Sequence, residues 1–119
     1  MEISTRQAEG ATVVDVTGDI TLYNSPEVRK VLLDLLREKR VLRVIVNLQN
    51  VRYIDSAGVA SLVEALKVSR DLKSGLALYG LTRTTREVLE LTRLIRVFEV
   101  YGTEQEALHG SGAGTNPSK

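Results

Sequence analysis

One short segment of the chain combines residue types that could take part in phosphoryl transfer. The segment Asp55-Ser56-Ala57-Gly58 follows an apolar run and precedes a helical pattern, so it lies where a strand ends and a helix begins. The N-terminus of a helix presents unpaired backbone N–H groups and partial positive charge, and both stabilise an anion. Ser56 could therefore offer its hydroxyl to a phosphoryl donor, or it could only cap the helix. Asp55 could likewise cap the helix or orient the serine hydroxyl.

Gly58 carries a more specific signal than its neighbours. Glycine within the first turn of a helix destabilises that helix by about 1 kcal/mol relative to alanine. Two explanations fit such a glycine: its backbone packs closely against another segment, or a partner approaches closely at this point. Gly58 is therefore a candidate both for close packing and for partner contact.

Composition excludes several other kinds of active site. The chain has 119 residues, no cysteine and a single histidine, His109. Thiolate metal sites and cysteine nucleophiles are therefore impossible, and a Ser-His-Asp triad or a multi-histidine metal site lacks its residues. The sequence also has neither a P-loop nor a protein-kinase signature. We expect no catalysis, no metal and no cofactor in this chain, which would instead be the substrate of an enzyme.

The charge balance and the hydropathy set the expected surroundings of the protein. Sixteen basic residues stand against 15 acidic ones, and the net charge of +1 gives no bulk attraction to nucleic acid. The start of the chain lacks the basic and apolar regions of a signal peptide, and no apolar stretch approaches the ~18 residues of a membrane span. We expect a cytoplasmic monomer that neither binds nucleic acid nor inserts into a membrane.

Strands and helices alternate along the rest of the chain. Five segments are predicted to be strands: residues 2–7, 11–17, 41–48, 76–79 and 97–100. Four helices are predicted, beginning at Asn24-Ser25-Pro26, at Asp55 or Ser56, at Thr82 or Thr84, and at Glu104. This order indicates right-handed crossovers and a mainly parallel sheet. The first strand is expected at an edge of the sheet, where an antiparallel pairing is an option.

Apolar periodicity predicts which parts of these elements are buried. The run at residues 41–48 suits a central strand that is covered on both faces. In the first helix, Asn24-Ser25-Pro26 is expected to supply a capping side chain followed by proline at the first helical position. Three apolar stripes are predicted: one in the first helix (Val28, Val31, Leu32, Leu35 and Leu36), one in the second (Val59, Leu62, Val63 and Leu66) and one in the third (Val88, Leu91 and Ile95).

The end of the chain differs in composition from the rest. Residues 110–119 read GSGAGTNPSK and contain no branched apolar residue. This composition is typical of a flexible terminus or an expression remnant. We therefore expect a single domain over residues 1–109, followed by a tail over residues 110–119.

Several motifs, in the same order, resemble the STAS domain of anti-sigma factor antagonists over about residues 3–108. They are Gly18-Asp19-Ile20, Val44–Leu48 followed by Val51, Tyr53 and Ile54, Asp55–Val59, and Val88–Thr92 followed by Leu94. The resemblance implies an α/β fold. The expected architecture is one STAS-like domain, with a mixed, mostly parallel sheet of about four to five strands covered by about four helices.

The resemblance also implies a phosphorylation switch. In the family, the first serine of the Asp-Ser segment is phosphorylated by the anti-sigma factor, a serine kinase with a histidine-kinase-like ATPase fold. The unmodified antagonist binds that kinase and frees the sigma factor, and a PP2C-like phosphatase resets the modified form. Ser56 would be the phosphoacceptor here. A phosphate adds about −1.5 to −2 charges, so beside Asp55 it would repel an acidic partner with little change in fold.

The same resemblance implies a set of partner-binding residues around Ser56. They are Asp19, Thr21, Tyr23, Asn24, Tyr53, Asp55, Ala57 and Gly58. Turn chemistry and partial packing are an equally good explanation of Tyr23, Asn24 and Tyr53. Two of these positions depart from the family pattern: Ala57 replaces a second hydroxyl residue, and Thr21 replaces a residue that is acidic in many members.

Two other functions compete with the switch. The chain could be a stand-alone STAS subunit of a transporter or of a stressosome-like assembly, with Ser56 serving only as a helix cap. It could also be a nucleotide-binding protein or an enzyme of the doubly wound type. The latter would need a phosphate loop after a strand, and the sequence contains none.

Overall fold

One mixed sheet positions the candidate site. The computed structural model describes residues 1–110, so the predicted tail lies outside the described residues except for Gly110. The strands of this part are β1 (Glu2–Ala8), β2 (Ala11–Thr17), β3 (Arg43–Asn50), β4 (Gly75–Tyr79) and β5 (Glu99–Tyr101), and they lie in that order across the sheet. β1 pairs antiparallel with β2, and every other pairing is parallel. The edge position predicted for the first strand is confirmed, and so is the predicted sheet.

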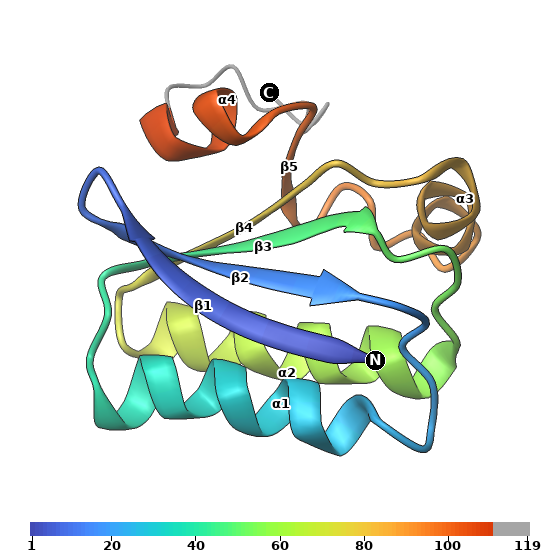
Figure 1. Ribbon diagram of the computed structural model, residues 1–119, viewed down its shortest axis with the longest axis horizontal. Coiled ribbons are helices and arrows are strands. Elements are labelled where there is room, and N and C mark those ends of the chain that lie inside the picture. Colours follow the sequence, from blue (N-terminus) through green and yellow to red (C-terminus); the bar gives the residue numbers. More distant parts are fainter. Residues whose placement is uncertain (111–119) are drawn as a thin grey trace.

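The helices lie on both sides of this sheet (Figure 1). The described part contains α1 (Ser25–Leu33), which continues into a π-helical turn, η1 (Asp34–Glu38), then α2 (Ser56–Asp71), α3 (Arg83–Leu91) and α4 (Glu104–His109). α1 and α2 run side by side along one face, α4 lies over the other face, and α3 lies beyond the ends of β3 and β4. The start of α2 therefore lies at the carboxyl ends of the parallel strands.

Alternate residues of each strand face two different apolar clusters, because successive side chains of a strand point to opposite faces. In β3, Val44, Val46 and Leu48 belong to the large core that includes α1 and α2, whereas Ile45 belongs to a smaller cluster under α4. All five residues from Val44 to Leu48 are buried. The prediction of a central strand covered on both faces is confirmed for this stretch.

The side-chain cap predicted at the start of the first helix does not form. Asn24 occupies the N-cap position, but its side chain makes no capping hydrogen bond to α1, although Pro26 does occupy the first turn. Instead, Asn24 Oδ1 accepts a hydrogen bond from the Thr21 N–H, and its Nδ2 donates to the Asp19 carbonyl, both at 2.8 Å. The amide thus folds the preceding loop back on itself, because asparagine bonds to nearby backbone as readily as it caps.

The predicted apolar face of the third helix is wrong at Leu91 alone. Val88 and Ile95 pack against the large core, as predicted. The helix ends at Leu91, whose side chain is 83% exposed, and the fully buried residues of α3 are Thr85 and Leu89. The chain leaves the helix at once because Arg93 adopts a left-handed conformation with φ 63°. The last strand likewise begins later than predicted, at Glu99.

A polar network joins the outer face of the sheet to α4. The Arg6 guanidinium bonds to the carboxylates of Asp15 (2.7 Å) and Glu104 (2.6 Å), and Glu104 also accepts from the Tyr79 hydroxyl at 2.9 Å. Asn47 Nδ2 donates to Asp15 at 2.8 Å. The hydrogen bonds from Arg6 lower the pKa of Asp15 and that of Glu104, whereas burial and then the bond to Glu104 raise the pKa of Tyr79 to about 12.

Replacing Arg6 by methionine is expected to lower the free energy of unfolding at neutral pH by about 1 kcal/mol, a small value because the Arg6 side chain is 43% exposed and screened by solvent. The two carboxylates have folded pKa values below the ordinary 3.8 and 4.5, so their ion pairs stabilise the fold above those values. That contribution is lost as the pH falls through the lowered pKa values. The difference in the free energy of unfolding between the wild type and Arg6→Met should therefore shrink as the pH falls from about 5 to about 2.

Urea unfolding across this pH range measures the effect. Arg96→Met is the matched control, because Arg96 forms no ion pair within the described residues and should stay within about 0.5 kcal/mol of the wild type. A difference between wild type and Arg6→Met that does not change with pH would contradict the assignment of these ion pairs.

Candidate functional site

Ser56 is the first residue of α2, and its side chain is exposed. The cap of the helix is Asp55, whose Oδ1 accepts a hydrogen bond from the Gly58 N–H at 2.9 Å. Within residues 1–110, the Ser56 hydroxyl forms no hydrogen bond, and the N–H groups of Ser56 and Ala57 have none either. Of the two caps considered from the sequence, Asp55 is correct and Ser56 is wrong. A free hydroxyl therefore stands at the positive end of the helix.

Asp55 also connects the start of α2 to the loop between β2 and α1. Its Oδ2 accepts from the Leu22 N–H at 2.8 Å, across 33 positions of sequence. Two backbone bonds run beside this contact, from Asp55 N–H to the Ile20 carbonyl at 3.0 Å and from Ile20 N–H to the Tyr53 carbonyl at 2.9 Å. The carboxylate thus positions a loop, and it forms no hydrogen bond with the Ser56 hydroxyl.

Close packing explains Gly58. A Cβ atom at this position would lie 2.6 Å from Cγ1 of Ile54, 2.8 Å from Cγ2 of Ile20 and 2.9 Å from the Ile20 carbonyl oxygen. Gly58 is buried, as are both isoleucines. Only a residue without a side chain lets the first turn of α2 lie against the Ile20 backbone. Of the two explanations open from the sequence, packing accounts for this glycine.

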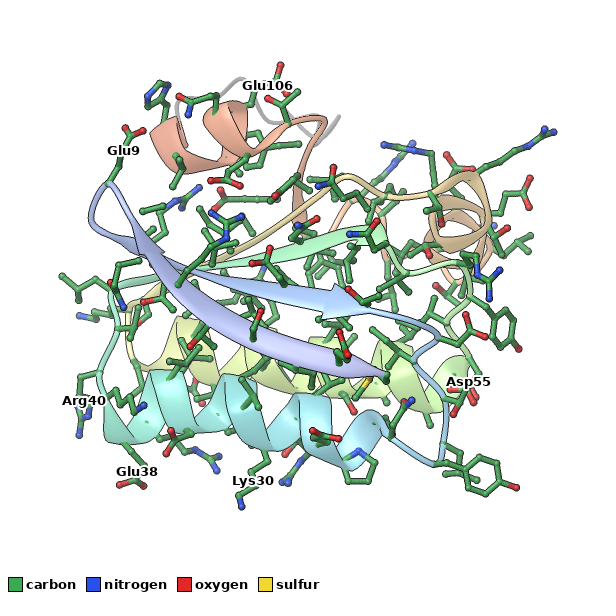
Figure 2. All side chains as sticks on the ribbon, in the orientation of Figure 1. Glu9, Lys30, Glu38, Arg40, Asp55 and Glu106 are labelled. Atoms are coloured by element: carbon green, nitrogen blue, oxygen red, sulfur yellow. The ribbon has the colours of Figure 1, made fainter. Side chains whose placement is uncertain are left out.

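The structure brings the predicted partner-binding residues together in two adjoining segments. Asp19, Thr21, Tyr23 and Asn24 lie in the loop between β2 and α1. Tyr53 and Asp55 lie in the segment between β3 and α2, and Ala57 and Gly58 in the first turn of α2. Figure 2 shows Asp55 at the opposite end of the molecule from Glu38 and Arg40. Asn24 and Thr21 hold the loop internally, and Asp19 has a buried Oδ1 with no hydrogen-bond partner.

The tip of this loop is apolar and exposed. Tyr23 is 92% exposed, Leu22 65% and Tyr53, in the adjoining segment, 47%. These are half of the large apolar side chains exposed within residues 1–110. Sequence reasoning missed Leu22, and the available signal was an apolar side chain between the strand predicted over residues 11–17 and the helix predicted to begin at Asn24. Exposed aromatic and aliphatic groups on a rigid loop are typical of protein contact sites.

Two other features of the described part bear on the kind of site. Residues 1–110 contain no group of three acidic or histidine side chains that could hold a metal ion. No helix among them is long and apolar enough to cross a membrane. What the site does present is a hydroxyl, free backbone donors and an apolar loop tip, an arrangement suited to protein contact and to modification of the serine.

The domain that carries this site has a recognised family. The sequence profile of the STAS domain matches residues 2–107, and the chain belongs to that family. Among curated proteins, it is 32% identical to the anti-sigma-B factor antagonist of Listeria monocytogenes, over 95% of this chain and 96% of that one.

Solved structures share the fold at lower identity. An anti-sigma factor antagonist from Mycobacterium paratuberculosis superposes with a TM-score of 0.84 at 21% identity, covering 92% of each chain. The Bacillus cell fate determinant SpoIIAA, in its phosphorylated form, gives 0.71 at 17% identity, covering 92% of this chain and 98% of that one. A sulfate transporter family protein from Wolinella succinogenes gives 0.70 at 19% identity, over 84% and 83% of the two chains.

Proposed function

We propose that this chain is an anti-sigma factor antagonist. In this proposal the unmodified protein binds an anti-sigma factor and thereby releases a sigma factor, and phosphorylation of Ser56 turns the binding off. The observation that carries the proposal is the exposed Ser56 hydroxyl, free of internal hydrogen bonds, beside a loop that Asp55 holds in place. The names of the curated relatives support the same role.

The geometry explains how one phosphate would act without unfolding the domain. The Ser56 hydroxyl has no internal bond to lose on modification, and the free N–H groups of Ser56 and Ala57 can stabilise an anion. The phosphate adds about −1.5 to −2 charges next to the Asp55 carboxylate. A bound partner that is acidic at this point would be repelled, and its contact with Leu22 and Tyr23 would be lost.

The proposed partners follow from the family resemblance. The anti-sigma factor would be a serine kinase with a histidine-kinase-like ATPase fold, and a PP2C-like phosphatase would remove the phosphate. The chain itself would supply the acceptor serine and the docking surface, and the kinase would supply ATP and the catalytic groups.

A second candidate is a STAS subunit of a transporter or stressosome-like assembly without a phospho-switch. The likeness in fold to a transporter family protein supports it. It assigns Ser56 only a capping role, however, and Asp55 is the residue that caps α2. The antagonist role is therefore the better supported of the two.

A paired binding experiment tests the proposed function. When Ser56→Ala is used as bait in the native lysate, it is expected to retain the kinase. Ser56→Asp and the phosphorylated wild type are expected to bind the kinase about 100-fold more weakly, because each adds negative charge at the contact. Ser4→Asp, at an exposed serine of β1, is the control and should bind like the wild type.

Mass spectrometry after incubation with the captured kinase and ATP should locate the phosphate on Ser56. Phosphate on another residue, or none, would refute the switch. Capture of the same membrane or scaffold proteins by both Ser56 variants would support the assembly role instead.

A further inference from the structure

A groove runs along α2, starting at Ser56. Its volume is about 620 Å³. It is lined by Ser56, Val59, Ala60, Val63, Glu64 and Lys67 of α2, and by Thr92 and Leu94 of the segment that follows α3. The groove is therefore continuous with the proposed docking site, and it leads away from that site down the length of the helix.

The α2 side of the groove follows one side of the helix. Ser56, Ala60, Val63 and Lys67 are spaced four, three and four residues apart, the spacing of neighbours on successive turns. The twelve residues from Ser56 to Lys67 are separated by eleven rises of about 1.5 Å, so the groove spans about 16 Å, or about three turns of a docked helix. Ala60 is exposed and Val63 is partly so, and both side chains are small enough to let another helix approach closely.

The charges along the groove differ in their partners. Glu64 is held by Arg29 of α1 at 2.7 Å, and this hydrogen bond is the main cause of its lowered pKa. Lys67, at the far end, is exposed and has no ion pair within the described residues. Glu64 is thus paired with Arg29, and the charge of Lys67 is only the smallest cause of the lowered pKa of Glu64. Because Lys67 forms no ion pair in the described part, its ammonium group remains available to a partner.

We infer that this groove receives an amphipathic α-helix of the anti-sigma factor. The apolar face of that helix packs on Ala60, Val63 and Leu94, and an acidic residue of the same helix pairs with Lys67. The inference rests on the proposed function and extends its contact surface from the loop tip to the middle of α2.

The lining of the groove selects a helix over an extended peptide. An extended segment needs main-chain hydrogen bonds from its receptor, but the backbone of α2 is bonded within the helix and the lining is mostly apolar. A helix satisfies its own backbone and offers only side chains to the groove. One end of such a helix would lie beside Ser56, where a phosphate would add negative charge to its contact with an acidic partner.

Calorimetry tests the inference by measuring how tightly each variant binds the purified kinase. The kinase is the protein that Ser56→Ala retains from the lysate. Ala60→Arg fills the groove and is expected to weaken binding about 30-fold. Lys67→Glu removes the charge pair and is expected to weaken it about tenfold, and changing the facing acid of the kinase helix to lysine should restore the affinity. Lys30→Glu is the matched control on α1, where Lys30 points away from the body of the protein in Figure 2, and should bind like the wild type.

The possible outcomes distinguish failure of the docked helix from failure of the proposed function. Loss of affinity in both groove variants, with unchanged thermal unfolding and with rescue by the swapped charge, supports the docked helix. Groove variants that bind like the wild type, while Ser56 still controls binding, overturn the helix alone. A wild-type chain that binds no kinase overturns the proposed function and the helix together. If the wild type formed dimers and Ala60→Arg dissociated them, the occupant of the groove would be a second copy of this chain. That result would also overturn the inferred helix of the anti-sigma factor.

Discussion

Replacement of Gly58 by alanine is expected to lower the free energy of unfolding by about 2 kcal/mol. The added methyl group would meet two buried side chains and a backbone carbonyl oxygen at 2.6–2.9 Å, so either α2 or the Ile20 backbone must move. Overpacking of this kind costs about 3 kcal/mol at the upper end of the usual range, and the better helix propensity of alanine returns about 1 kcal/mol. Because α2 is displaced at its first turn, the position of Ser56 relative to Leu22 should also change.

Urea unfolding of Gly58→Ala against the wild type measures the effect. The control is Gly102→Ala, because a Cβ at the exposed Gly102 meets only a Glu106 carboxylate oxygen at 3.4 Å. The control should change stability by less than about 0.5 kcal/mol. If Gly58→Ala were as stable as the wild type, the close approach of α2 to Ile20 would not be a constraint on this fold.

Replacement of Asp55 by asparagine is expected to separate the loop from the helix. The carboxylate accepts two backbone N–H groups, one from Gly58 and one from Leu22, at 2.9 and 2.8 Å. An asparagine amide has one oxygen, so one of the two N–H groups would face an NH₂ group instead. We expect a loss of about 1.5 kcal/mol in the free energy of unfolding.

The same substitution should weaken binding to the anti-sigma factor about tenfold or more, since an unanchored loop must be ordered on binding. Amide hydrogen exchange followed by NMR is the direct measurement, and either Leu22 or Gly58 should lose protection. Asp71→Asn, at the exposed last residue of α2, is the control for the loss of charge. Unchanged protection of both amides together with unchanged affinity would show that Asp55 does not position the loop.

Local patterns were sufficient to predict the architecture. The strand predicted over residues 11–17 has the bounds of β2, and the apolar run at residues 41–48 predicted β3, whose ends lie two residues later. The motif at Asp55–Gly58 predicted a strand-to-helix junction, and α2 does begin there. Such patterns succeed because the period of a strand or helix depends on neighbouring residues alone.

The errors arose where a local pattern had several solutions. Leu91 has helical spacing from Val88, but the chain turns at Arg93 and leaves Leu91 in solvent. Asn24 has the right type and position for a cap, but it bonds within its own loop. Periodicity and residue type do not say which of two nearby backbone groups a side chain will bond.

The sequence by itself determined the order of strands and helices, the family resemblance and the position of a serine at the start of a helix. Only the tertiary structure decided that Asp55 caps that helix while holding Leu22, that Gly58 packs against Ile20, and that a groove extends from Ser56 to Lys67. These features depend on contacts between residues far apart in the chain. Their geometry is settled by how α2 packs on the sheet and its loops, which no local period encodes.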